Sequence, residues 1–101
     1  MKIEVLYVPG CPNYQPAVEA VTNILVSESL RTEICEVPVR SEAEAMALRF
    51  PGSPTIRVNG DDVEPETTIT PGLACRLYEN GTRVPSEEAI RRAVSTARQR
   101  K

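Results

Sequence analysis

The sequence predicts an α/β domain whose strands and helices follow in the order β-α-β-α-β-β-α. Strand-like runs rich in β-branched residues alternate with segments whose apolar residues recur at helical spacing. Clusters of Pro, Gly and Asn separate these segments. Two strands joined by a helix are expected to lie parallel, and a hairpin adds an antiparallel strand. We therefore expect one domain over 1–101, with a four-stranded mixed sheet and helices on both faces.

The first strand and helix surround a short breaker segment. Lys2 to Val8 is rich in β-branched and aromatic residues and predicts a buried strand. Apolar residues at helical spacing then predict a helix from about Asn13 to Leu30, with Pro12 suited to its first position. Pro16 fits this helix poorly because it lacks a backbone donor, so we expect a kinked or late first turn.

A second strand, a short helix and a third strand follow. Thr32 to Val39 predicts the second strand. Ser41 and Glu44 form a capping box that begins a helix ending near Arg49. After a Pro- and Gly-rich loop, Thr55 to Val58 predicts the third strand.

The last third of the chain predicts one more strand and one more helix. Asn59-Gly60 predicts a turn, and the stretch from Asp61 to Gly72 predicts a loop. Leu73 to Glu79 predicts the fourth strand. Ser86 is the expected N-cap of the final helix, whose basic tail suits a C-terminus.

Composition excludes several classes of function. The 101 residues include no histidine, so Ser-His-Asp triads, Cys-His pairs and His-ligated zinc are excluded within the chain. The three cysteines lie far apart, which fits a reducing compartment and predicts no metal site. No phosphate-binding or dinucleotide motif is present, so we expect no cofactor. The net charge of −2 gives no field that favours nucleic acid. With no apolar span and no signal-peptide layout, we expect a cytoplasmic protein that does not enter a membrane.

Cys11 is the strongest candidate for a reactive group. It follows a strand and a Pro-Gly turn, and it opens the first predicted helix. Unpaired amide groups and the helix dipole at such a position stabilise a thiolate, the form that attacks disulfides. The alternative is an ordinary small residue in a turn.

The chain resembles the thioredoxin and glutaredoxin family in four places. They are the first strand, the tetrad Cys11-Pro12-Asn13-Tyr14, the segment Gly52-Ser53-Pro54-Thr55 and the Asn59-Gly60 hairpin. It also resembles small bacterial and archaeal thioredoxin-like proteins that are sometimes labelled after alkylmercury lyases. The resemblance implies a cis Pro54 packed against the reactive cysteine. The substrate-binding residues that it implies are Pro12, Tyr14, Ser53, Pro54 and Thr55.

One departure from the family motif changes the expected mechanism. The family has a second cysteine where this chain has Tyr14, so the usual resolving thiol is missing there. A monothiol scheme remains, in which Cys11 is the nucleophile and glutathione, another small thiol or a distant cysteine is the resolver. Tyr14 either donates a hydrogen bond to the thiolate or packs against the loop, and we favour packing.

The other two cysteines receive different interpretations. Cys35 lies in the second predicted strand without a basic neighbour, which favours core packing. Cys75 precedes Arg76 and is a second catalytic candidate. It either begins the fourth strand away from Cys11, or the preceding loop carries it near enough to resolve the mixed disulfide.

The leading hypothesis is a thiol-disulfide oxidoreductase that acts through Cys11. Its partners would be a disulfide- or thiol-bearing protein or a low-molecular-weight thiol. One alternative is a non-catalytic module with the same fold, and another is a thiol protein associated with mercury or arsenic.

Overall fold

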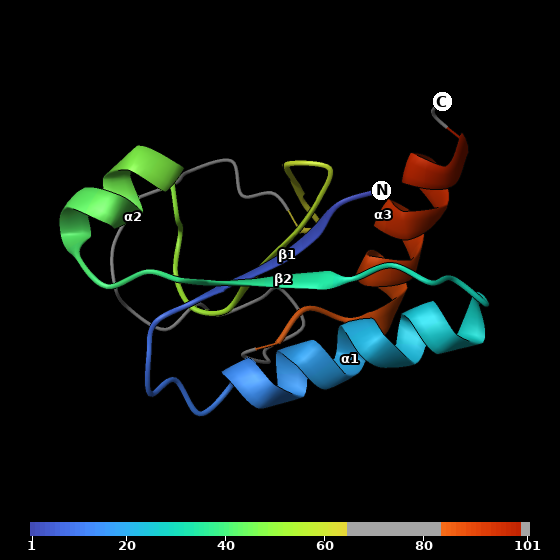
Figure 1. Ribbon diagram of the computed structural model, residues 1–101, viewed down its shortest axis with the longest axis horizontal. Coiled ribbons are helices and arrows are strands. Elements are labelled where there is room, and N and C mark those ends of the chain that lie inside the picture. Colours follow the sequence, from blue (N-terminus) through green and yellow to red (C-terminus); the bar gives the residue numbers. More distant parts are fainter. Residues whose placement is uncertain (65–83, 100–101) are drawn as a thin grey trace.

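The chain forms an α/β structure with three helices and a four-stranded mixed sheet over residues 1–64 and 84–99, which the computed structural model describes (Figure 1). The elements in chain order are β1 (Ile3–Tyr7), α1 (Tyr14–Ser27), β2 (Ile34–Pro38), α2 (Glu42–Leu48), β3 (Thr55–Val58), β4 (Asp61–Asp62) and α3 (Glu87–Gln99). The predicted α/β class is therefore confirmed. No helix of these two described ranges is both long and apolar enough to cross a membrane.

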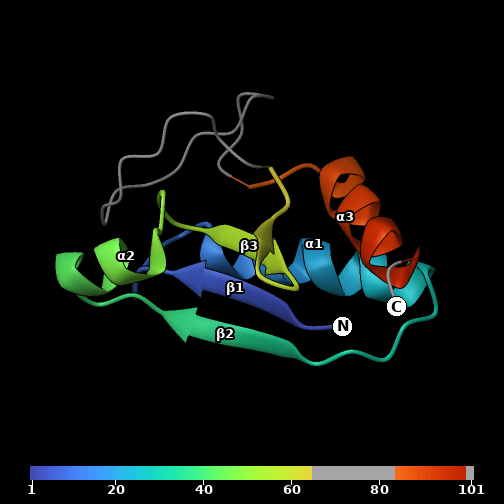
Figure 2. The same ribbon diagram turned by 90° about the horizontal axis from the view of Figure 1, so that it is seen from above.

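The sheet has the strand order β2-β1-β3-β4. β1 and β2 run parallel, with Ile3 beside Ile34 and Tyr7 beside Pro38. β3 runs antiparallel to both β1 and β4. The parallel pair means that β1 and β2 end at the same edge of the sheet, and Figure 2 shows both strands pointing toward the end of the molecule where α2 lies.

β4 corrects the prediction of a loop from residue 61 onward. Asp61 and Asp62 pair with Val58 and Arg57 of β3. Asn59 and Gly60 both have positive φ angles, 52° and 88°, which is the conformation of a two-residue hairpin turn. Such a turn sets the next residues directly against the preceding strand, although aspartate has a low strand propensity. The strand predicted over Leu73–Glu79 lies outside the described residues.

Two apolar clusters cover opposite faces of the sheet. Ile3 and Val5 belong to a cluster that also contains the buried residues of α1 and, from α3, Ile90 and Val94. Leu6 belongs to a second cluster with Val39, Ala45 of α2 and Phe50. Successive strand residues point to opposite faces, so Val5 and Leu6 separate the α1 and α3 face from the α2 face. Helices therefore cover both faces, as expected.

α1 begins later and ends earlier than predicted. Its first residue is Tyr14, so Pro12 lies two residues before the helix and not at its first position. Pro16 is the third helical residue, where a backbone N–H has no partner within the helix. Of the two outcomes that Pro16 led us to expect, a kinked or a late first turn, the structure has the late start. The helix ends at Ser27, because Ser29 adopts a φ of 55° and closes a C-terminal capping turn in which the Leu30 N–H donates to the Leu25 carbonyl at 2.9 Å.

The side-chain caps of the other helices are as predicted. The Ser41 hydroxyl oxygen accepts a hydrogen bond from the Glu44 N–H at 3.1 Å and begins α2. Ser86 accepts from the Ala89 N–H at 3.1 Å and begins α3. α2 ends where Arg49 takes a left-handed conformation, and the chain then turns into the segment that carries Ser53 and Pro54.

Candidate functional site

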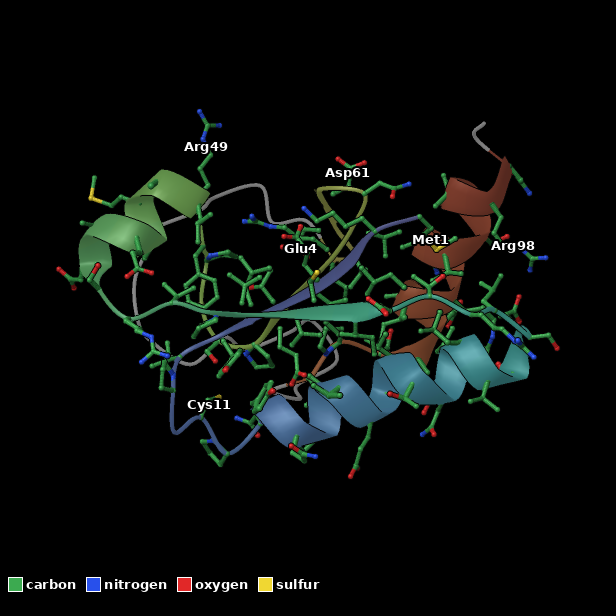
Figure 3. The ribbon with its side chains drawn as sticks, in the orientation of Figure 1. Met1, Glu4, Cys11, Arg49, Asp61 and Arg98 are labelled. Carbon is green, nitrogen blue, oxygen red and sulfur yellow. The ribbon has the colours of Figure 1, made fainter. Side chains whose placement is uncertain are left out.

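The loop that carries Cys11 is tied to the segment before β3 through one residue, Val8. The Cys11 N–H donates to the Val8 carbonyl at 3.0 Å, which folds the loop back onto the end of β1. The Val8 N–H donates to the Ser53 hydroxyl oxygen at 3.0 Å. Figure 3 shows Cys11 on the loop between β1 and α1. These two bonds bring together sequence segments that lie 45 positions apart.

The segment before β3 is buried and held in a single turn. The Ser53–Pro54 peptide bond is cis, which is the isomer that the resemblance implies. The Thr55 hydroxyl donates to the Gly52 carbonyl at 2.6 Å, and this bond spans Pro54. Ser53 and Thr55 are 1% and 0% exposed. The Ser53 and Thr55 hydroxyls therefore form hydrogen bonds within the protein and are shielded from solvent.

Tyr14 packs against the end of β1. Its ring stacks on Tyr7 with centroids 3.9 Å apart and planes inclined by 16°. The stack joins the first residue of α1 to the last residue of β1 across the Cys11 loop. Packing is the role that we favoured for Tyr14 from the sequence. Tyr7 was missed from the sequence, although two tyrosines that flank a Pro-Gly-Cys-Pro segment were a visible signal.

Cys11 is half-buried and precedes α1 by three positions. The Tyr14 N–H donates to the Cys11 carbonyl at 3.3 Å, so a short turn separates the thiol from the helix. The expectation that Cys11 itself opens the helix is wrong, because this turn, which includes Pro12, lies between Cys11 and α1. Pro12 is exposed, and it is therefore the accessible neighbour of the half-buried thiol.

Cys35 is exposed, and its predicted core packing is wrong. β2 is an edge strand of the described sheet, and Cys35 lies beside Glu4 of β1. Both residues are on the same face as Leu6, but α2 packs only near Leu6, at the far end of these strands. An alternating strand pattern predicts which residues share a face, but it does not predict how far a short helix extends over that face.

The remaining predicted site residue, Cys75, lies outside the described residues with its neighbour Arg76, and so does its proposed pairing with Cys11. Among residues 1–64 and 84–99, no three His, Cys, Asp or Glu side chains gather as metal ligands do. The residues described thus give no support to a soft-metal site.

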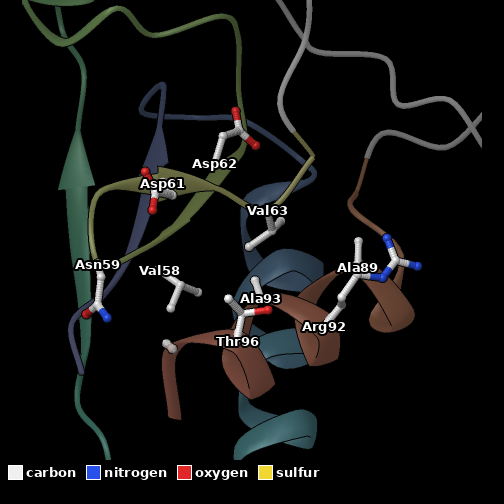
Figure 4. Close-up of a pocket in the computed structure, with 10 residues that line it drawn as sticks. Val58, Asn59, Asp61, Asp62, Val63, Ala89, Arg92, Ala93 and Thr96 are labelled. Carbon is white, nitrogen blue, oxygen red and sulfur yellow. The ribbon is translucent and has the colours of Figure 1, made fainter. Parts of the chain in front are cut away.

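A cavity of about 230 Å³ lies away from Cys11, between the β3–β4 hairpin and α3 (Figure 4). Val58 and Val63 line it from the hairpin side, and Ala89 and Ala93 line it from α3. Asp61 and Arg92 also line it. Because neither Cys11 nor Ser53 lines this cavity, it is separate from the candidate site.

Comparisons with known proteins return no similar protein. The sequence matches no protein-family model and no curated protein, and no solved structure matches the fold. The residues of the site therefore carry the functional argument alone.

Proposed function

We propose that this protein is a thioredoxin-like thiol-disulfide oxidoreductase that uses Cys11 as a single nucleophile. The observation that carries the proposal is the pair of hydrogen bonds through Val8, which join the Cys11 loop to Ser53 and the cis Pro54. Reactive side chains often lie on loops whose position is fixed by a rigid scaffold. The strand order β2-β1-β3-β4, with α1 and α3 on one face and α2 on the other, supports the thioredoxin-like topology.

The proposed reaction has two exchange steps. The Cys11 thiolate attacks one sulfur of a disulfide RSSR, so that a Cys11–SR bond forms, the S–S bond breaks and RS⁻ leaves. A low-molecular-weight thiolate R′S⁻ then attacks the SR sulfur, which releases RSSR′ and restores the Cys11 thiolate. The electrons that reduce RSSR come from R′SH, and no second cysteine is required at Tyr14.

Burial at the site favours small disulfides over an extended polypeptide. Ser53, Pro54 and Thr55 are all buried, so an extended chain cannot pair with them in this conformation. Cys11 is half-buried and Pro12 is exposed. A small disulfide needs access to one sulfur only, and this arrangement provides it.

Turnover of a small disulfide with glutathione tests the proposal. We expect the wild-type protein to catalyse the exchange, and Cys11→Ser to lower the rate by about a hundredfold or more, because the covalent intermediate cannot form. The matched control is Cys35→Ser, which removes an exposed thiol from β2 and should leave the rate unchanged.

Two results would contradict the proposal. If wild type accelerates no exchange, the protein is a binding module with this fold and not an oxidoreductase. If Cys35→Ser abolishes turnover and Cys11→Ser does not, the reactive thiol is Cys35 and not Cys11.

A further inference from the structure

The outer edge of β2 has no strand beside it among residues 1–64 and 84–99. β2 lies at one end of the strand order and pairs with β1 alone. Figure 2 shows it as the outermost strand, with β1 between it and β3. An open edge presents backbone N–H and C=O groups to which another strand can add. What can bind there depends on which groups of β2 point outward.

The hydrogen bond of Val39 fixes the direction of the backbone groups along β2. The Val39 N–H donates to the Tyr7 carbonyl at 2.7 Å, so the backbone groups of this residue point toward β1. Successive residues of a strand point these groups to alternate edges, so Ile34, Glu36 and Pro38 point theirs outward. Pro38 has no N–H to donate. Within β2, only Ile34 and Glu36 thus offer both a donor and an acceptor at the outer edge.

A second copy of β2 matches these groups in one antiparallel register. When a two-fold axis passes through Cys35, Ile34 of each copy lies opposite Glu36 of the other, and every offered N–H meets a C=O. An axis through Glu36 sets two carboxylates against each other, and it sets Ile34 opposite Pro38, which cannot return a bond. An axis through Ile34 or Val37 sets one of the two offered residues beyond an end of the opposite strand. The register through Cys35 therefore satisfies the edge best.

That register sets the two Cys35 residues directly opposite each other. They form a non-hydrogen-bonded pair, whose Cα atoms lie about 4.5 Å apart in an antiparallel sheet. A disulfide needs Cα atoms about 4.4–6.8 Å apart. Cys35 is exposed, on the part of its sheet face that α2 does not reach. Both sulfurs project from the same face of the joined sheet, so they can meet.

The edge alone buries too little surface to hold two copies together. A stable interface buries about 800 Å² on each partner, and an isolated pair of strands is marginally stable in water. β2 has only 5 residues. Its hydrogen bonds therefore give a brief encounter, which a covalent bond would make lasting.

We propose that β2 is a dimerisation edge, at which a second copy of this chain pairs antiparallel and is joined by a Cys35–Cys35 disulfide when a small disulfide serves as oxidant. The Cys35 thiolate of one copy attacks RSSR, so that Cys35–SR forms and RS⁻ leaves. The Cys35 thiolate of the second copy attacks the Cys35 sulfur of this mixed disulfide, so that the dimer forms and a second RS⁻ leaves. Two thiols are oxidised, RSSR is reduced to two RSH, and the protons of the thiols end on RS⁻.

Oxidised glutathione tests the inference in a chain with one thiol. Cys11→Ser combined with Cys75→Ser leaves Cys35 as the only cysteine. We expect a dimer on non-reducing electrophoresis, twice the monomer mass by light scattering and a Cys35–Cys35 peptide by mass spectrometry. Dithiothreitol should return the monomer. The same peptide is expected from wild-type protein.

The matched control moves the thiol by one position. Adding Cys35→Ser and Glu36→Cys to that background leaves one thiol on the same strand, and both positions are exposed. In the proposed register the two Cα atoms at position 36 lie farther apart than a disulfide allows, so we expect the ratio of dimer to glutathione adduct to fall by at least about tenfold. Circular dichroism confirms that each variant folds.

Three results would overturn the inference. If Cys35 carries glutathione but no dimer forms, the edge does not accept a second copy. If the Glu36→Cys variant gives the same ratio of dimer to adduct, random collision explains the link. If Cys35 forms neither product, its thiol does not take part in exchange. Because these variants lack Cys11, none of these results decides the proposed function.

Discussion

Cys11 and Cys35 occupy regions of opposite character. Cys35 is exposed on β2, beside Glu4, in a regular strand. Cys11 is only half-buried, but its loop is fixed by hydrogen bonds through Val8 to Ser53 and leads into the tyrosine stack. Greater exposure favours access of a reagent to Cys35. Placement in a fixed loop favours a productive geometry at Cys11, and catalysis depends on geometry as well as access.

The comparison is tested most sharply by competition between the two thiols. When native protein meets a limiting amount of hydroxyethyl disulfide at neutral pH, we expect Cys11 to form the mixed disulfide about tenfold faster than Cys35, because its fixed loop holds the sulfur in one geometry for attack. Peptide mapping measures both adducts in one sample. In denaturant the two rates should converge, because the fold no longer distinguishes the thiols. Faster reaction at Cys35 in native protein would show that exposure alone decides.

Removal of the Ser53 hydroxyl should loosen the Cys11 region and leave β2 unaffected. Ser53→Ala deprives the part-buried Val8 N–H of its acceptor, so we expect a loss of about 1–3 kcal/mol in the free energy of unfolding. Mixed-disulfide formation at Cys11 should slow, and alkylation of Cys35 should not change. Urea unfolding and the adduct assay measure the two effects.

Ser27→Ala is the matched control for that variant. The Ser27 hydroxyl donates to the Ile24 carbonyl at 3.0 Å within α1, on an exposed residue. Its loss should change the stability by less than about 0.5 kcal/mol. Equal losses in the free energy of unfolding for Ser53→Ala and Ser27→Ala would mean that the link between Val8 and Ser53 has no special role.

The stacked tyrosines give a smaller effect that can be measured as a coupling. Tyr7→Leu, Tyr14→Leu and the double variant form a cycle in which we expect a coupling of about 0.5–1.5 kcal/mol in stability. The same cycle should change the rate at Cys11, because the stack joins the two ends of its loop. A coupling near zero would mean that the two rings do not stabilise each other.

The sequence was sufficient for the elements whose signals are local. The Ser41 and Ser86 caps and the strand over Thr55–Val58 depend on neighbouring residues, and the structure has them where the pattern predicted. The link from Val8 to Ser53 was not predictable, because it depends on the register between β1 and β3. The exposure of Cys35 was also missed, since it depends on the limited extent of α2.

The smallest expected effect concerns the stability contribution of Cys35. A cysteine packed in a core loses apolar contacts when its sulfur is replaced by an oxygen, and the buried hydroxyl then needs a partner. Cys35 is exposed, so both costs are absent, and Cys35→Ser should change the free energy of unfolding by less than about 0.5 kcal/mol. Urea unfolding of wild type and variant under reducing conditions measures the difference. Val5→Thr is the contrasting control, because it places a hydroxyl at a fully buried position of the neighbouring strand and should cost about 1–3 kcal/mol. A similar loss for both variants would mean that Cys35 is packed in solution. The two thiols would then differ in their surroundings less than the structure indicates, and Cys35→Ser would no longer serve as the silent control for Cys11→Ser.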